Sequence, residues 1–596
     1  MARNTRNRID KYEKISRLAR RRGFFWSSSE IYGGVGGFID LGPLGVQMKL
    51  KIMEKWRKFF IKRHQEFIVE IETPVVMPGK VFEASGHLEH FTDYIVECLN
   101  CHRKFRADHL LEEALGLEGL ERFSERDLDE LIRKNNVKCP ECNNTLGTVQ
   151  KFNLLFKTTI GPYAENIGYA RPEAAQGMFT SFMRVYEAMR RKLPLGIAQL
   201  GKVLRNEISP RQGPIRLREF TIMELELFYD PKNPKCELLN EVADVELRLL
   251  TEDRVAKGIK EPLIETVKEA VKKKHIVSEW NAYFMALAKL FVNELGVPDD
   301  KQMFVAKLPE ERAHYALQTY DQVVWTERWG WVEVSGHAYR TDYDLRRHME
   351  FSGQDLRAYR FLKEPIIKKK LVVKLNKPLI GKVFRKKAKE IIAYLESEKP
   401  ENIAKQLERN GYVEVAGEKV GKEYLSILET EEKVTTERFI PHVAEPSFGA
   451  ERCLYITLEY SYCEKNSRVI LSIPRDLSPV EVAVFPLITF DELVSKAKEI
   501  YNLLKNRGFT VIYDEEGSIG RRYVRVDEIG VPFSITVDSQ TLSDETVTVR
   551  DRDTWKQVRL KINEVPDFIE LGIKKPRKSF EELVKEFRTS KELILS

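Results

Sequence analysis

The chain has 596 residues, enough for about three or four domains. Apolar residues make up 42% and charged residues 32%, which excludes wholesale disorder and collagen-like repeats. No stretch of about 18 uncharged apolar residues occurs, and the N-terminal MARNTRNRID lacks an apolar signal core, so we expect a cytoplasmic protein without membrane contact. Seven cysteines, a small and odd number, do not predict a disulfide framework.

The net charge of +7 is concentrated at the N-terminus. Residues 1–22 carry nine basic side chains, Arg3, Arg6 and Arg8 among them, against Asp10 and Glu13, so the rest of the chain is balanced. This basic arm is either a solvated helix or a segment that contacts phosphates, and the sequence leaves both interpretations open.

A glycine-rich turn and a helix follow the arm. The run EIYGGVGGFIDLGPLG predicts a sharp turn, and it matches neither GxGxxG after a strand nor the phosphate loop GxxxxGK[ST]. Met48, Ile52, Trp56 and Phe60 then recur every four residues, which predicts an amphipathic helix. The next run, FIVEIETPVV, is typical of a strand that Pro74 interrupts.

Two CxxC pairs lie in what we interpret as an insertion. Their spacing lets four thiolates converge tetrahedrally on one metal ion, and four cysteines leave no open coordination position, which is typical of structural zinc. The alternative is a set of four unrelated thiols. The expected metal ligands are Cys98, Cys101, Cys139 and Cys142. The other three cysteines have no such spacing and are expected to be core residues: Cys236, Cys453 and Cys463.

A strand hairpin carries charged residues inside apolar runs. LGKVLRNEIS puts Arg205 and Glu207 on one strand face, and REFTIMELELF puts Phe220 and Glu224 on one face of the return strand. Charges inside strands are costly unless they face a ligand, and the loop SPRQGPIR between them suits a phosphate clamp. An exposed hairpin with surface ion pairs is the alternative.

The remaining elements follow in chain order. We expect residues 231–320 to be mostly helical and residues 360–435 to be a lysine-rich insertion. EPSFGAER places small residues before Arg452 at a helix start, where its guanidinium can meet phosphate. From about residue 478, apolar strands alternate with a helix, which predicts a separate α/β domain.

Together these segments resemble the glycyl-tRNA synthetases of the dimeric, archaeal and eukaryotic-like type, from about residue 20 to 575. The helix and strand ending at Pro74 resemble motif 1 of class II synthetases, RNEISPRQGPIRLREF resembles motif 2, and SFGAER with its helix resembles motif 3. Within class II, EIYGGVGGFIDLGPLG, RPEAAQG, VEVSGHAYRTDYDL and EPSFG are similar to glycine-specific signatures.

The resemblance implies an α+β multidomain protein. It would combine a six-stranded antiparallel class II catalytic sheet flanked by helices, a zinc-ribbon-like insertion and a C-terminal α/β anticodon-binding domain. The expected boundaries are 1–97 (basic arm and motif 1), 98–150 (zinc insertion), 151–230 (motif 2), 231–320 (helical insertion), 321–359 (catalytic core), 360–435 (insertion), 436–477 (motif 3), 478–575 (anticodon-binding domain) and 576–596 (C-terminal helix or tail).

The resemblance also implies residue roles. Arg205, Glu207 and Arg452 would be catalytic: Arg205 at the ATP α-phosphate, Arg452 at the β- and γ-phosphates, and Glu207 near adenine and the tRNA end. ATP would be bound by Arg205, Asn206, Glu207, Ile215, Arg216, Leu217, Arg218, Glu219, Phe220, Glu333, Val334, Gly449 and Arg452. Glycine would be bound by Arg106, Glu173, Phe220, Glu224, Arg340, Glu445, Ser447 and Gly449.

The implied activity is the two-step ligation of glycine to tRNA(Gly), with ATP as substrate, Mg²⁺ near Glu333 and a homodimer formed through motif 1. Glycine offers only two charged ends, so carboxylates would hold its ammonium group, Arg340 and Arg106 would hold its carboxylate, and a filled pocket would exclude any Cβ. Two alternatives are a non-catalytic protein that kept the synthetase fold and a zinc-ribbon nucleic-acid binder.

Overall fold

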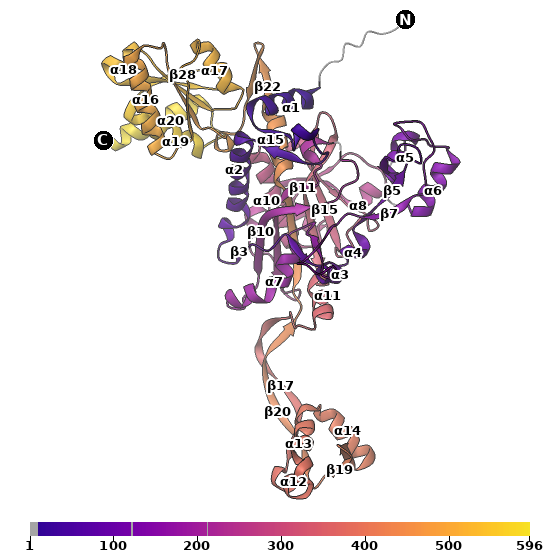
Figure 1. The fold of residues 1–596 in the computed structure, drawn as a ribbon. Helices are drawn as coiled ribbons and strands as arrows, with labels where there is room; N and C mark the ends of the chain where they lie inside the picture. The colour runs from indigo at the N-terminus through magenta and orange to yellow at the C-terminus, as the bar shows by residue number, and fades with distance from the viewer. Residues whose placement is uncertain (1–9, 118, 121–122, 211, 596) are drawn as a thin grey trace. The chain divides into compact units, whose positions relative to one another are not determined.

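The computed structural model describes residues 10–117, 119–120, 123–210 and 212–595 (Figure 1). The predicted arm residues Arg3, Arg6 and Arg8 lie outside the described residues. The chain divides into two compact units, Met1–Leu356 with Pro441–Ser596, and Arg357–Ile440. No helix in the described ranges combines the length and the apolar character that a membrane span needs.

The first unit is built around a nine-stranded sheet in the order β13-β12-β14-β15-β16-β21-β11-β10-β3. Its six central strands, β14 to β10, are antiparallel to their neighbours, as the class II resemblance implies, while β12 and β3 pair in parallel at either side. The strands are β3 (Ile68–Glu70), β10 (Leu195–Leu204), β11 (Glu219–Tyr229), β12 (Glu246–Leu250), β13 (Leu263–Thr266), β14 (Gln302–Ala306), β15 (Gln318–Thr326), β16 (Gly330–Thr341) and β21 (His442–Gly449).

One face of this sheet carries the main core. The predicted amphipathic helix is α2 (Pro43–Phe60), and its Met48, Ile52, Trp56 and Phe60 are all 0% exposed. They pack with α10 (Glu279–Glu294), α15 (Ala450–Ser461) and the odd-numbered residues of β11. Because strand side chains alternate, the even-numbered residues of β11 face the other side, where α7 (Ala175–Ala188) packs against Phe228.

Residues 231–320 are not mostly helical, and this prediction was wrong. They supply the strands β12, β13 and β14 as well as α8 (Glu252–Ala256), α9 (Val267–Lys272) and α10. The run VELRLL has apolar residues at every second position, and Leu247 and Leu249 are 0% exposed on the core face. The charged residues around this run are also compatible with a helix. The alternation of apolar and charged residues, with a period of two, instead indicates a strand, and this strand extends the sheet.

The cysteine-containing insertion is a small separate layer. The strands β5 (Thr92–Glu97), β6 (Lys104–Arg106) and β7 (Gln150–Asn153) form a sheet in the order β6-β5-β7. The helices α5 (Ala107–Leu115) and α6 (Glu125–Lys134) pack with it around Leu111 and Leu128. Ser124 and Asp127 form a capping box that starts α6.

The C-terminal part of the first unit is the predicted α/β domain. Its five-stranded sheet has the order β25-β24-β26-β27-β28, with three parallel strands followed by two antiparallel ones. Phe580, Leu583 and Phe587 of the last helix belong to its core. Its elements are β24 (Val482–Pro486), α16 (Asp491–Asn506), β25 (Val511–Tyr513), α17 (Ile519–Asp527), β26 (Phe533–Val537), α18 (Ser539–Asp544), β27 (Thr546–Asp551), β28 (Gln557–Lys561), α19 (Val565–Lys574) and α20 (Phe580–Leu595).

The second unit is an antiparallel hairpin that ends in a small helical body (Figure 1). Two long strands, β17 (Ala358–Leu375) and β20 (Leu425–Phe439), pair with an irregularity between Phe361 and Ile366. The helices α12 (Lys377–Phe384), α13 (Ala388–Ser397) and α14 (Pro400–Asn410) pack with the hairpin β18 (Tyr412–Val415) and β19 (Glu418–Gly421). This unit coincides closely with the predicted insertion at 360–435.

Candidate active site

A cavity of about 490 Å³ lies on the face of the main sheet opposite α2. Its lining includes Glu173, Glu224, Glu445 and Ser447, which were predicted to bind glycine, together with Arg205 from the predicted phosphate-binding set. Residues far apart in the sequence therefore meet at one place, as the synthetase resemblance requires.

The acidic end of the cavity is held by the register of the sheet. Glu224 on β11 lies opposite Ser447 on β21, and Glu445 on β21 lies opposite Ala338 on β16. Glu173 precedes α7, and the backbone N–H of Ala174 donates a 2.6 Å hydrogen bond to Glu224. The strand backbones thus fix where Glu224 and Glu445 lie, and the hydrogen bond from Ala174 ties the segment that carries Glu173 to them.

Arg171 ties this end of the cavity to two other segments. Its guanidinium is 1% exposed and donates to the carbonyl oxygen of Lys202 on β10 at 2.9 Å and to that of Thr73, just after β3, at 3.0 Å. Arg171 and Glu173 are two residues apart, so the segment that carries Glu173 is anchored to both strands.

Arg340 lies beneath the acidic end and is 0% exposed. It forms ion pairs with Asp344 at 2.9 Å, Glu445 at 3.1 Å and Glu173 at 3.2 Å, and the ring of Tyr315 covers it with a centroid distance of 3.7 Å. Burial opposes the charge, but Asp344, Glu445 and Glu173 raise the pKa of Arg340 well above its usual range. Its guanidinium is therefore engaged by side chains of the protein itself.

The carboxylates titrate in opposite directions. Burial works against ionisation of Glu173, but the charge of Arg340 outweighs it and lowers the pKa of Glu173 well below the usual value. Burial and the charge of Glu173 raise the pKa of Glu224. Burial and the nearby Glu224 raise the pKa of Glu445 well above the usual value, although Arg340 opposes this. Neighbouring carboxyls in this cavity therefore differ in how readily they ionise.

The predicted nucleotide residues meet at the neighbouring end. Arg205, Glu207, Ile215, Arg216, Leu217, Phe220, Gly449 and Arg452 line one pocket. Arg452 is held by the carbonyl oxygens of Ile215 at 2.8 Å and Glu333 at 2.9 Å. Arg205 lies 5.4 Å from the ring centroid of Phe220, and Arg216 pairs with Glu207 at 2.8 Å.

Other residues of the predicted nucleotide set lie around this pocket. Arg218 donates to the carbonyl oxygens of Glu207 and Gly36, which links the motif 2 loop to the glycine-rich turn. The N–H of Asn206 donates to Leu154. Glu219 pairs with Lys202 at 3.3 Å.

Two predicted residues point elsewhere. Val334 is 2% exposed within the core on the far face of the sheet, so only its backbone is available on the cavity side. Arg106 pairs with Asp108 at 2.8 Å and with Asp93 at 3.3 Å. Asp93 lines the cavity, whereas Arg106 is not among its described lining residues.

The structure adds residues that sequence reasoning missed. Lys307, Asp321, His87 and Tyr315 all line the cavity. Lys307 pairs with Asp321 at 3.1 Å, and Asp321 on β15 lies near Glu333 on β16, across a β-bulge. For Tyr315 and Asp321 the sequence signal was a short polar run, RAHYALQTYDQ, which crosses the end of the region 231–320 interpreted as helical. No motif marked Lys307 or His87.

Asp321 and Glu333 form a second carboxylate pair at the nucleotide end. Burial and the charge of Glu333 raise the pKa of Asp321 to about 7, although Lys307 opposes this shift. For Glu333, the charges of Arg452, Lys307 and Arg205 outweigh burial and lower the pKa to about 2. Two hard oxygen donors beside the pocket predicted to bind the nucleotide fit the ligand preference of Mg²⁺.

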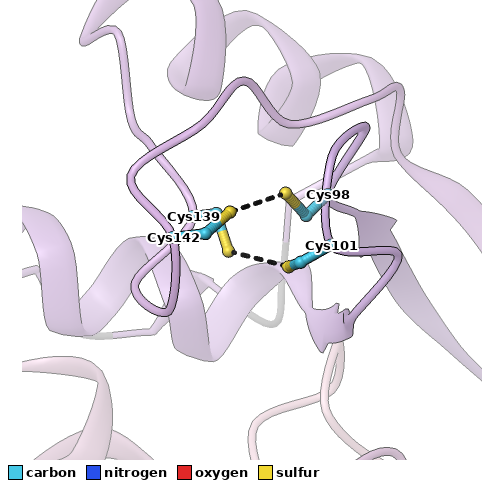
Figure 2. A group of neighbouring side chains, drawn as sticks. All are labelled: Cys98, Cys101, Cys139 and Cys142. Atoms are coloured by element: carbon cyan, nitrogen blue, oxygen red, sulfur yellow. Dashed lines mark hydrogen bonds between the residues drawn. The ribbon is translucent and has the colours of Figure 1, made fainter.

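The four predicted metal ligands converge on one point (Figure 2). The Sγ atoms of Cys98 and Cys142 are 3.4 Å apart, those of Cys101 and Cys139 are 3.7 Å apart, and all four lie within 4.8 Å of one another. Four sulfurs at about 2.3 Å from a tetrahedral zinc ion are about 3.8 Å apart, so the cluster has the size that zinc requires. A backbone hydrogen bond from Asn144 lowers the pKa of Cys142 to about 6, which favours the thiolate.

The remaining cysteines match their predicted roles less uniformly. Cys236 and Cys453 are buried in the main core, as expected, but Cys463 is exposed on β22 (Tyr462–Lys465). The expectation that all three are core residues was therefore wrong for Cys463, whose side chain points outward from a short two-stranded hairpin.

This sheet and the convergence of the motif residues define a class II aminoacyl-tRNA synthetase. The fold is similar to that of prolyl-tRNA synthetase from Giardia lamblia, with a TM-score of 0.50 at 14% identity over 93% of this chain and 76% of that one. The prolyl-tRNA synthetase of Cryptosporidium parvum also has a TM-score of 0.50, at 13% identity over 98% of this chain and 79% of that one. Residues 481–571 match the family model described as the anticodon binding domain.

Sequence relatives identify the branch of the class II synthetases to which the chain belongs. The chain is 52% identical to the glycine--tRNA ligase of Aeropyrum pernix over 94% of this chain and 96% of the relative. It is 49% identical to that of Pyrococcus furiosus over 94% and 98%, and 46% identical to that of Methanocaldococcus jannaschii over 95% and 99%. The chain belongs to the glycine--tRNA ligase family.

Proposed function

We propose that the protein activates glycine with ATP in this cavity and transfers the glycyl group to tRNA(Gly). The observation that carries the proposal is the convergence of Glu173, Glu224 and Glu445 in the same cavity as Arg205. An ammonium group bound by the carboxylates brings the carboxylate of so small a substrate next to an arginine.

Glycine recognition rests on its two charged ends. Glu173, Glu224 and Glu445 would surround the ammonium group, while Ser447 and the backbone at Gly449 limit the space beside Cα. A buried acidic pocket favours an ammonium ion strongly, since water is excluded. A larger amino acid is rejected by steric clash, so the proposal needs no editing site.

The carboxylate end is assigned to Arg205. Arg205 lines the cavity, whereas Arg340 is 0% exposed and already paired with three carboxylates. Arg340 therefore serves the ammonium site by neutralising and orienting its carboxylates. The contacts of Arg340 and Arg106 with the glycine carboxylate that the family resemblance implied stay predictions and require both side chains to rearrange.

ATP binding uses the pocket at the other end. Phe220 and Arg452 would enclose the adenine ring, with Ile215, Leu217 and Gly449 as apolar walls. Arg205 and Arg218 would bind phosphate oxygens, and Glu207 would face adenine and the incoming tRNA end. Asn206, Arg216, Glu219 and Val334 would contribute to the shape and backbone of the pocket.

Asp321 and Glu333 would hold a Mg²⁺ ion. When bound, this ion would neutralise charge on the ATP phosphates. Lys307, which pairs with Asp321 at 3.1 Å, would keep the Asp321 carboxylate turned toward the nucleotide end.

The reaction would proceed in two steps. The glycine carboxylate attacks the α-phosphorus in line and pyrophosphate leaves, giving glycyl-adenylate; Arg205 stabilises the charge that develops at the α-phosphate. A ribose hydroxyl of the terminal tRNA adenosine then attacks the glycyl carbonyl and AMP leaves. Positioning and charge stabilisation carry the rate, and we assign no side chain as a general base.

The tRNA would contact two regions of the chain. The domain at residues 481–571 would bind the anticodon, in keeping with its match to the anticodon binding domain. The lysine-rich unit at 357–440 would contact the acceptor stem by charge. Replacing the lysines at 368–370 with alanine should weaken tRNA binding and reduce its dependence on salt; unchanged affinity would argue against this contact.

We also propose a homodimer formed through motif 1. Val46 and Leu50 on α2 are 38% and 49% exposed, and Val76, beyond β3, is 44% exposed. The strand β3 is an edge of the main sheet. Exposed apolar side chains beside a free sheet edge favour burial against a second copy. Sedimentation of wild-type and Leu50→Glu proteins tests this, since the variant should shift to the monomer.

The cysteine cluster would hold one structural zinc ion per chain. Its four sulfurs have the spacing of a tetrahedral site with no open position. Metal analysis of the purified protein should find about one zinc per chain; a metal-free, fully folded insertion would contradict this assignment.

Glycine-dependent exchange of pyrophosphate into ATP tests the central proposal. The wild-type protein should exchange with glycine and not with alanine or serine. Exchange with alanine or serine in place of glycine would refute the specificity. No exchange with any amino acid would favour the alternative of a non-catalytic protein with a synthetase fold.

A further inference from the structure

Glu226 is a fully buried carboxyl to which the proposed function assigns no role. It follows Glu224 by two residues on β11, so both side chains lie on the cavity face of the sheet. Its exposed fraction is 0%, and neither of its carboxyl oxygens has a hydrogen-bond partner. A polar group in this condition is costly and therefore requires an explanation.

The surroundings of Glu226 are mostly acidic. One carboxyl oxygen from each of Glu224, Glu226 and Glu445 lies within 4.8 Å of the others. The nearest positive charge is Arg340, whose Nη1 atom is 4.0 Å from Oε1 of Glu226 and 3.1 Å from Oε2 of Glu445. Arg340 therefore stabilises a negative charge on Glu445 more than one on Glu226, because Glu226 is the more distant of the two carboxyls.

The other elements packed here add negative charge and apolar surface. Asp344, from α11 (Tyr343–Ser352), adds another negative charge, and Phe179, from α7, covers Arg340 with an apolar ring at 5.1 Å. Burial, followed by the charge of Glu445, raises the pKa of Glu226 well above its usual range, although Arg340 opposes this shift. A neutral carboxyl has an O–H group that can donate to a nearby carboxylate.

We propose that Glu226 is a positioning residue of the pocket formed by Glu173, Glu224 and Glu445: a neutral carboxylic acid, unpartnered in this structure, that donates a hydrogen bond to the Glu224–Glu445 pair when an ammonium group is bound and then holds Glu445 against Arg340. This inference rests on the proposed glycine-binding function. It means that the pocket presents three carboxylates to the ammonium group, backed by a fourth carboxyl that stays uncharged. A fourth charge would repel the other three and disorder them.

Two substitutions test the proposal. Glu226→Gln keeps the shape and a neutral N–H donor, so the KM for glycine in the exchange reaction should stay within about twofold of the wild type. Glu226→Leu keeps an apolar side chain of similar size but removes the donor. Its KM for glycine should rise about tenfold, with a smaller change in kcat, because the loss is of ground-state positioning. Glu445→Gln is the matched control, because it removes a carboxyl that the bound ammonium group would hold in its ionised form.

The outcomes separate the possible roles of Glu226. If Glu226→Gln raises KM as much as Glu445→Gln, Glu226 is an ionised ligand and the proposal is overturned. If Glu226→Leu leaves KM unchanged, Glu226 does not position Glu445, which also overturns it. If the proposed function itself is wrong, the result differs from both of these outcomes, because the wild-type protein would then show no glycine-dependent exchange.

An infrared measurement keeps the proposal testable if Glu226→Leu does not fold. The difference spectrum between wild-type protein and Glu226→Gln at neutral pH should contain the C=O band of a protonated carboxylic acid. Absence of that band, with only a carboxylate signal lost, would contradict the neutral state of Glu226.

Discussion

The carboxylates of Glu173, Glu224 and Glu445, proposed to form the ammonium pocket, and the four thiols of the cysteine cluster are both groups of acids that repel one another when ionised. The two sites are held together differently. The carboxylates lie on or beside strands at the centre of the main sheet, and Arg340 neutralises them from below. The four cysteines lie on loops over a small core, and two of them are half-buried. The first site is therefore held together by side chains of the protein itself, whereas the second would depend on the proposed zinc ion for cohesion.

The largest effect should follow removal of the metal from the cysteine cluster. Structural zinc supplies about 10–16 kcal/mol of apparent binding free energy in small domains, so chelation should loosen the insertion at 98–150. Limited proteolysis should then cut within this insertion first, while residues of the main sheet stay protected. Cleavage at the same sites and rates with and without chelator would contradict this expectation.

Arg340→Ala should break the ammonium pocket from within. The substitution leaves Glu173, Glu445 and Asp344 buried without their cation, and loss of one partner of a buried pair costs about 3–5 kcal/mol. The melting temperature should fall and glycine-dependent exchange should be lost. Arg347→Ala is the control: Arg347 lies on α11, which follows β16 in the chain, its side chain is 29% exposed, and its loss should change both little.

Glu445→Gln should weaken glycine binding while leaving the fold intact. A hydrogen bond to a charged group contributes about 1.5–3 kcal/mol, which corresponds to a rise in the KM for glycine of about tenfold to a hundredfold. The KM for ATP should change little, because the nucleotide end is separate. Equal effects on both KM values would show that the two ends are not independent.

The smallest effect is a pH dependence of glycine binding. In the empty pocket, burial raises the pKa of Glu445, so its protonated form stabilises the fold at low pH and this contribution is lost as the pH rises through that pKa. The ammonium group of glycine favours the ionised form. The KM for glycine should therefore rise as the pH falls, and the increase in melting temperature caused by glycine should grow as the pH rises.

Much of the architecture could be predicted because its signals are local. The four-residue spacing of Met48 to Phe60 gave the helix α2, and the CxxC pairs gave the cysteine cluster. The strand period placed Glu224 on the cavity face, and the motif resemblance brought Glu173 and Glu445 to it. The same period places the Val334 side chain on the core face of the sheet, and the prediction that Val334 binds ATP did not take this into account.

The rest depends on contacts between distant segments. Nothing in the local sequence says that Arg340 is covered by Tyr315 and paired with Asp344, so it was expected to bind glycine directly. Lys307 lay in a region interpreted as helical, where charged neighbours masked the alternation of short strands. Asp321 lay at the start of the predicted core segment 321–359, but no motif marked it. The missed residues are those that a sheet brings together from different strands.

The anchoring of Arg171 has a consequence for communication within the protein. Its single guanidinium donates hydrogen bonds to the carbonyl oxygen of Thr73, at the end of motif 1, and to that of Lys202, on the motif 2 strand. Arg171 itself lies two residues before Glu173. A displacement of the motif 1 edge would therefore be transmitted through one rigid side chain to the ammonium site. In the proposed dimer, subunit association and glycine affinity would then be thermodynamically linked, so that glycine would favour the dimer as much as the dimer favours glycine.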